Sequence, residues 1–114
     1  MDSDSLLADT VTNYLAQLAT HASPATVAAY RQDLSAFCQF AEQRGITQAS
    51  ALDTALARAF LGAERSRGLA PRSLARRRAA LSRFADALVR DQVLMDNPIR
   101  LLRTPKQPSH LPKP

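Results

Sequence analysis

Residues 71–90, PRSLARRRAALSRFADALVR, have the pattern of one amphipathic helix rich in arginine. At about 100° per residue, one side of this helix collects four arginines within roughly 40°: Arg72, Arg76, Arg83 and Arg90. The opposite side collects the residues expected to face a core: Leu74, Leu81, Phe84, Ala85 and Leu88. A cationic stripe of this kind on a small protein most often meets phosphates. A solvated surface helix that happens to use arginine is the alternative.

The composition favours an all-α fold. The chain has 114 residues, which suits one domain with a single modest core. Hydrophobic residues make up 46% of it, and alanine supplies much of that share. Alanine-dense segments favour closely packed helices over sheet. We therefore expect a compact four-helix bundle with a short fifth helical turn and an extended proline-rich C-terminal segment.

The charge is divided unequally between the two halves of the chain. Residues 1–64 carry three arginines against seven acids, net −4, whereas residues 65–114 carry twelve cations against three acids, net +9. Such an asymmetric field steers polyanions. Membrane headgroups are the rival polyanion, but a membrane-surface helix puts large apolar side chains opposite its cations, and here the core needs that side. The acidic N-terminus and the lack of any run of transmembrane length favour a cytoplasmic location.

Capping and turn residues predict where the helices begin and end. A first helix is expected over 5–20 with Ser5 as its cap, a second from Ser23-Pro24 to Gly45, a third from Asp53 to a break between residues 62 and 68, the fourth from Pro71, and a short turn over 98–102 opened by Asn97-Pro98. The composition then changes to TPKQPSHLPKP, which is typical of an extended linker. We therefore assign residues 1–103 to a helical domain and 104–114 to an interdomain linker.

Catalytic chemistry is not expected within these residues. His21 and His110 have no carboxylate or nucleophile at helical spacing, and the three glycines form no phosphate-cradling loop. Tyr14 and Tyr30 lie on apolar seams, where a core tyrosine is the default. Cys38 is a single cysteine within a helical pattern, so neither a disulfide framework nor a metal cluster is predicted, and a buried inert thiol is. We expect no catalytic residue, no metal and no cofactor.

Taken in order, several short motifs resemble the N-terminal core-binding domain of tyrosine recombinases of the phage-integrase family. They extend over nearly the whole chain: Ser23-Pro24-Ala25-Thr26 with Tyr30, Arg44-Gly45, Gly68-Leu69, Ser73-Leu74-Ala75 with Arg77, Ala80-Leu81, Phe84, Leu88-Val89, Asn97-Pro98, and Pro105-Lys106 followed by His110-Leu111-Pro112-Lys113. The last of these is the most specific and looks like the XerC type, which resolves chromosome dimers. Each motif is weak alone, and the agreement of their order carries the resemblance.

The resemblance implies a SAM-like helical domain that forms half of a C-shaped clamp around double-stranded DNA. A C-terminal catalytic domain, absent from this sequence, would hold the nucleophilic tyrosine, so the full-length protein would cleave and rejoin DNA strands while this chain would not. The implied setting is chromosome segregation at cell division, with a sister recombinase of the XerD type in a heterotetramer on DNA. The isolated chain is expected to be monomeric.

In this family the second and fourth helices face the DNA, in agreement with the arginine pattern. The candidate DNA-binding residues are Ser23, Thr26, Tyr30, Arg31, Arg72, Ser73, Arg76, Arg77, Arg83 and Lys106. Ser23 would cap its helix beside a phosphate, and arginine would clamp phosphate or read guanine. Tyr30 has a core role as its alternative. Arg77 lies near the edge of the apolar sector, where its alternative is a buried structural arginine with an acid partner.

Two other classes of function compete with the recombinase interpretation. A helical protein-interaction module would use the basic face for an acidic partner and would not prefer duplex DNA over heparin. A stand-alone transcriptional regulator would need a helix-turn-helix with a short turn, and residues 62–71 are long for such a turn.

Overall fold

The computed structural model describes residues 5–102, and within that range it contains helices and no strand. The elements are α1 (Leu7–Leu18), α2 (Pro24–Gln43), η1 (Ala49–Ala51), α3 (Thr54–Ser66), α4 (Pro71–Arg90) and η2 (Pro98–Leu101), where η marks a 3₁₀ helix. The predicted all-α fold with four main helices and a short fifth turn is confirmed. The predicted linker over 104–114, together with Lys106, lies outside the described residues.

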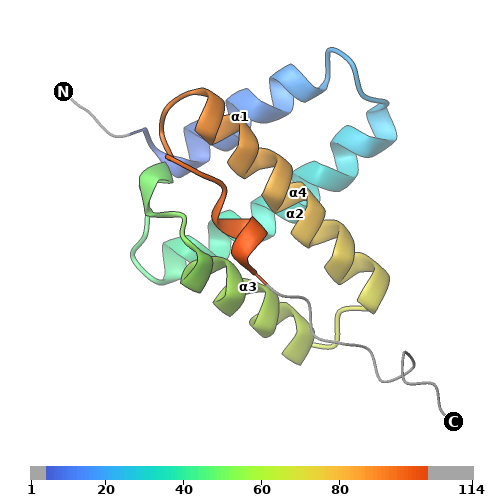
Figure 1. Ribbon diagram of the computed structural model, residues 1–114. Helices are drawn as coiled ribbons and strands as arrows, with labels where there is room; N and C mark the ends of the chain where they lie inside the picture. Colours follow the sequence, from blue (N-terminus) through green and yellow to red (C-terminus); the bar gives the residue numbers. More distant parts are fainter. Residues whose placement is uncertain (1–4, 103–114) are drawn as a thin grey trace, which may run out of the picture.

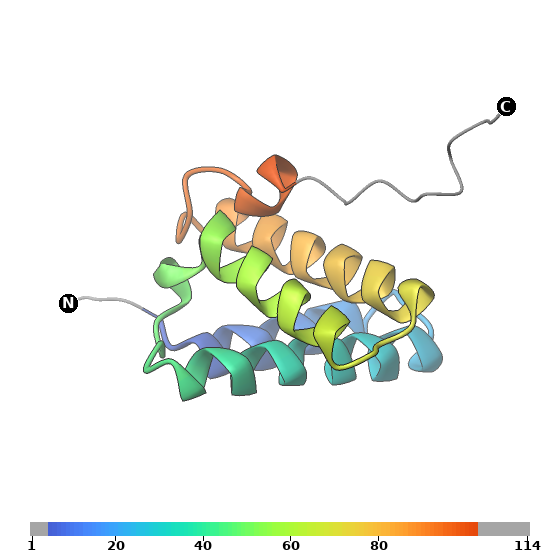
Figure 2. The same ribbon diagram turned by 90° about the horizontal axis from the view of Figure 1, so that it is seen from below.

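The helices form two layers. α1 and α2 make an antiparallel pair, and α3 and α4 lie over that pair (Figures 1 and 2). α4 packs against α1, α2, α3 and η2, so it contacts each of the other three main helices. Phe37 and Phe60 meet edge to face with their ring centroids 5.3 Å apart, and Tyr14 meets Phe84 in the same way at 5.8 Å. These aromatic contacts join α2 to α3 and α1 to α4.

Three of the predicted helix starts are confirmed by their capping geometry. The Ser23 hydroxyl oxygen accepts the backbone N–H of Thr26 at 3.1 Å, and Pro24 follows as the first helical residue of α2. The Asp53 carboxylate accepts the N–H of Leu56 at 2.8 Å at the start of α3. α4 begins at Pro71 as expected. The sequence therefore located these starts through local hydrogen bonding and proline geometry alone.

The predicted cap at Ser5 is wrong. α1 begins at Leu7, its N-cap residue is Leu6, and no side chain caps it. The reason is a backbone contact with the segment before η1. Leu6 forms an isolated antiparallel bridge with Gln48, and the Ser5 carbonyl accepts the N–H of Ala49 at 2.8 Å. This pairing holds residues 5 and 6 extended. η1 itself was not predicted, because an element of three residues is too short to show helical periodicity.

Asn97 attaches η2 to α4. Its side-chain oxygen accepts the N–H of Ile99 at 2.8 Å, which is the predicted cap. Its amide nitrogen donates to the Ser82 carbonyl at 3.0 Å and to the Asp86 carboxylate at 2.9 Å. Arg78 adds a second attachment, because its guanidinium donates to the Leu102 carbonyl at 2.8 Å. The chain after α4 is therefore folded back and held along that helix.

Replacing Asn97 with alanine should lower the free energy of unfolding by about 2–3 kcal/mol, because the change removes a cap and leaves buried polar groups unpaired. Urea unfolding followed by circular dichroism measures this. Asn13, which is exposed on α1, provides the matched control, and Asn13→Ala should stay within about 0.5 kcal/mol of the wild type. Equal stability of the two variants would contradict the role assigned to Asn97.

Candidate nucleic-acid interface

The arginines of α4 fall into three groups according to their partners. Arg76 and Arg77 bind carboxylates, and Arg78 binds backbone carbonyls. The third group has no hydrogen-bond or ion-pair partner among residues 5–102: Arg72, Arg83 and Arg90. One helix therefore provides both structural cations and free cations.

Arg76 and Arg77 belong to an ion network around two buried carboxylates. Its members are Asp33, Glu64, Arg67, Arg76 and Arg77. Asp33 on α2 is 1% exposed and Glu64 on α3 is 5% exposed. Arg76 grips Asp33 with two hydrogen bonds of 2.9 Å, and Arg77 donates to Glu64 at 2.6 Å while its Nε lies 3.3 Å from Asp33. Arg67 closes the network on Glu64 at 2.8 Å. Both buried carboxylates are thereby compensated, as buried charges must be.

This network changes what was expected of Arg77. The residue is 8% exposed and sits between two acids, so its guanidinium lies in the interior and not on the exposed face. The alternative of a buried structural arginine with an acid partner is the one observed. The helical pattern could not decide this, because Asp33 and Glu64 lie on other helices.

Arg76 occupies an intermediate place. Its side chain is 38% exposed, and its bidentate bond to Asp33 ties it to α2. The hydrogen bonds to Asp33 raise the pKa of Arg76, so its charge is permanent. The predicted position on the exposed stripe therefore holds in part, since the guanidinium reaches the surface but in a fixed orientation.

The remaining candidates lie on α2 and α4 or at their first turns. Ser23 and Arg31 are exposed on α2, and Thr26 is half-buried beside Ser23, whose hydroxyl donates to the Thr26 hydroxyl at 3.0 Å. Tyr30 is buried, with the Arg83 guanidinium 6.0 Å from its ring centroid, so the core alternative for Tyr30 is observed. Ser73 is half-buried near the start of α4.

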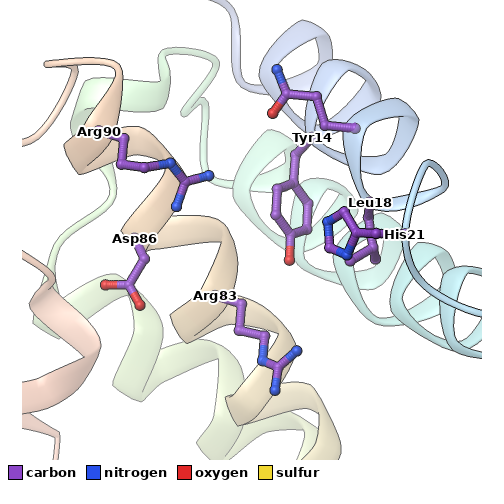
Figure 3. A pocket seen from close by; sticks show the side chains of 7 residues that line it. Tyr14, Leu18, His21, Arg83, Asp86 and Arg90 are labelled. Atoms are coloured by element: carbon purple, nitrogen blue, oxygen red, sulfur yellow. The ribbon is translucent and has the colours of Figure 1, made fainter.

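A shallow pocket of about 380 Å³ extends this surface between α1 and α4 (Figure 3). It is lined by Tyr14, Gln17, Leu18, His21, Arg83, Asp86 and Arg90. Arg90 belongs to the arginine stripe predicted for residues 71–90 but is not among the candidate DNA-binding residues predicted from the sequence. His21, which has no partner at helical spacing in the sequence, is exposed in the structure. No spacing in the sequence relates His21 to α4, because the fold alone brings the end of α1 beside it.

Three further features of residues 5–102 concern metal binding, thiol chemistry and membranes. Within residues 5–102 no group of three or more histidine, cysteine, aspartate or glutamate side chains is placed to hold a metal ion. Burial raises the pKa of the Cys38 thiol to about 11, so this half-buried cysteine stays protonated at neutral pH. Among the same residues no helix combines the length and apolar character needed to cross a membrane.

Comparison with known proteins identifies the relatives of this chain. Residues 9–92 match the family model described as phage integrase, N-terminal SAM-like domain. Over 104 residues, 91% of this chain, the sequence is 62% identical to the tyrosine recombinase XerC of Chromohalobacter salexigens. The XerC of Yersinia pestis is 41% identical over 80% of the chain. The chain spans about a third of the length of these curated relatives, 35% and 30% respectively.

A solved structure shows the same fold. The N-terminal domain of a phage integrase/site-specific recombinase from Haloarcula marismortui superposes with a TM-score of 0.82 and covers 90% of this chain and 98% of its own. The two sequences are 22% identical, so the agreement concerns the arrangement of the helices.

Replacing Arg77 with alanine should lower the free energy of unfolding by about 2–3 kcal/mol, because two buried carboxylates lose a charged partner and keep only the more exposed Arg67 and Arg76. Chemical denaturation of Arg77→Ala against Arg58→Ala provides the measurement and the control, since Arg58 is exposed on α3. An Arg77 variant as stable as the Arg58 variant would show that the network does not hold the helices together.

Proposed function

The chain belongs to the phage integrase N-terminal SAM-like domain family, and from that premise we propose that it is the DNA-binding domain of a XerC-like tyrosine recombinase. In this proposal α2 and α4 lie against a recombination half-site and form one half of a clamp around the duplex. The observation that carries the proposal is the unequal distribution of partners along α4. Arg72 and Arg83 are exposed and have no acidic partner among residues 5–102.

The buried acids account for this surplus of positive charge. Asp33 and Glu64 point into the network, where three arginines already surround them. The two carboxylates therefore neutralise only the arginines of the network, and the exposed guanidiniums of Arg72 and Arg83 remain uncompensated. Uncompensated guanidiniums on α4, together with the exposed Arg31 of α2, favour a polyanion over a neutral partner.

The candidate residues receive different roles in this proposal. Arg31, Arg72 and Arg83 contact phosphates or bases directly, and Arg76 does so from the orientation fixed by Asp33. Thr26 and Ser73 are short donors at the edges of the two helices. Tyr30 and Arg77 support the surface from below.

Ser23 and Lys106 complete the proposed site. Ser23 leaves the first amides of α2 beside a phosphate, in the manner of helix N-termini that bind anions. Lys106, which lies outside the described residues, is proposed to follow the backbone from the segment 104–114, which we propose as the linker that follows a core-binding domain of residues 1–103.

The activity of the whole protein is part of the proposal. The relatives named XerC are about three times as long as this chain, and we propose that strand cleavage and rejoining reside in a domain outside it. We further propose a cytoplasmic role in resolving chromosome dimers at cell division, in a heterotetramer with a XerD-type partner. Off DNA the chain is proposed to be monomeric.

Duplex binding by this chain should weaken steeply with salt. If about five cations meet phosphates, the slope of log K against log salt should lie near −4 to −5. Fluorescence anisotropy with a recombination half-site, a scrambled duplex and heparin, each at several ionic strengths, measures this. A flat salt response would remove the electrostatic basis, and equal affinity for heparin would favour the protein-interaction module.

The exposed arginines should separate from the buried one. Arg72→Ala and Arg83→Ala should each leave the melting temperature nearly unchanged and reduce the salt slope by about one unit if a phosphate contact is lost. A lost base contact should instead cost about 1–3 kcal/mol at one base pair. Arg58→Ala, with the same change of charge on α3, is the control. Unchanged DNA binding in both α4 variants would place the interface elsewhere.

The chain should form no covalent bond with DNA. Incubation with a nicked half-site that traps covalent intermediates should give no slower band on a denaturing gel, because both described tyrosines belong to the core: Tyr14 and Tyr30. Burial also raises the pKa of Tyr14, which makes it a poorer nucleophile. An adduct mapped to either tyrosine would overturn the assignment of catalysis to another domain.

A further inference from the structure

We propose that the pocket between α1 and α4 binds one backbone phosphate of the duplex, as a subsite separate from the junction of α2 and α4. The inference rests on the proposed DNA-binding function and extends it to a helix that the family resemblance did not assign to DNA. Its ligand groups are Arg83 and Arg90 from α4, the Tyr14 hydroxyl from α1, and His21 just after α1.

The two guanidiniums provide the charge. Arg83 and Arg90 are seven residues apart, about two turns or 10.5 Å along one side of the helix. Both line the pocket, and neither has an ion-pair partner among residues 5–102. Two uncompensated guanidiniums at one hollow repel each other unless an anion lies between them. A phosphate accepts several hydrogen bonds at once and suits such a pair.

The α1 side of the pocket supplies further hydrogen-bond donors. The Tyr14 ring packs on Phe84 while its hydroxyl end points into the hollow, near His21 (Figure 3). Burial raises the pKa of Tyr14, so the phenol keeps its proton and can donate it in a hydrogen bond. His21 is exposed at the rim, and the Gln17 amide lies on the same wall. Donors thus lie on both walls of the pocket.

Asp86 is the one acid at the pocket, and other partners hold it. Its position four residues before Arg90 and three after Arg83 would allow a helical ion pair with either. In the structure its carboxylate instead accepts from Asn97 at 2.9 Å and lies 3.5 Å from Arg100. Asp86 therefore pairs with η2 rather than with Arg83 or Arg90, and the two guanidiniums outnumber this one carboxylate at the pocket.

The position of the pocket favours a phosphate of the duplex over a free anion. Arg83 lines the pocket and also lies over the Tyr30 ring of α2, so the pocket adjoins the proposed α2–α4 surface. A strand that crosses that surface would bring a further phosphate to Arg83 and on to Arg90. The pocket is partly open to solvent, as a site for a continuous strand must be.

The test compares Arg90→Ala, His21→Ala and Tyr14→Phe with Arg58→Ala in half-site titrations of the 114-residue chain. Arg90→Ala should weaken binding about ten-fold or more at low salt and reduce the salt slope by about one unit. Tyr14→Phe keeps the ring and removes only the hydroxyl, and it should weaken binding by a smaller factor, as should His21→Ala. All variants should melt like the wild type. An Arg90 variant that binds like the Arg58 variant would overturn the subsite.

A second arm identifies the anion. Half-sites with one neutral methylphosphonate are scanned along the strand. At the phosphate held in the pocket, the modification and Arg90→Ala should give no further loss when combined, whereas at other positions their effects should add. Additivity at every position would overturn the assignment to a backbone phosphate.

Pyrophosphate titrations, followed by amide shifts of α1 and α4 in nuclear magnetic resonance spectra, separate the remaining outcomes. The wild type could bind pyrophosphate but no duplex, with pyrophosphate binding lost in the Arg90→Ala variant. In that case the proposed function and the duplex as the source of the phosphate are both wrong. If the wild type binds duplex through Arg72 while Arg90→Ala has no effect, the proposed function stands and the subsite alone fails.

Discussion

Two buried carboxylates impose the constraint on which this domain depends. Asp33 on α2 and Glu64 on α3 are nearly inaccessible to water, and a carboxylate in that position requires a cation with good hydrogen-bond geometry. Arg77 of α4 meets both of them, so the three helices share one electrostatic centre. Arg77 is the partner whose removal affects both carboxylates, which would then keep only the more exposed Arg76 and Arg67. Hydrophobic burial brings the helices together, and the network fixes where along α4 the other two helices lie.

The same constraint shapes the surface. Because Asp33 and Glu64 bind their arginines internally, they do not neutralise the next arginines on the helix. Adjacent positions on α4 thus have opposite roles, and Arg76 has both, since Asp33 fixes one edge of its guanidinium while the other reaches solvent. The binding surface that we propose is therefore held in place by the interior rather than carried on loops, which favours a preformed site.

Local signals in the sequence were enough for most of the fold. Ser23, Asp53 and Asn97 cap backbone N–H groups within three residues of themselves, and Pro71 opens α4, so the helix starts predicted from them were confirmed. Ser5 failed because a backbone bridge to Gln48, more than forty residues away, decides the start of α1.

The candidate site was less predictable for the same reason. A helical projection gives the angular position of an arginine around its helix. It does not show whether a neighbouring helix carries an acid that will pair with it. It therefore ranked Arg76 with Arg83 and could not assign Arg77 to the interior. The apposition of α1 and α4 was equally hidden, because the sequence contains no relation between His21 and Arg90 until the chain folds.

The bonds from Arg78 to the carbonyls of Ile99 and Leu102 have a mechanical consequence. A force that pulls on Leu102 would load the middle of α4 through Arg78, because this contact must break before η2 can detach from the helix.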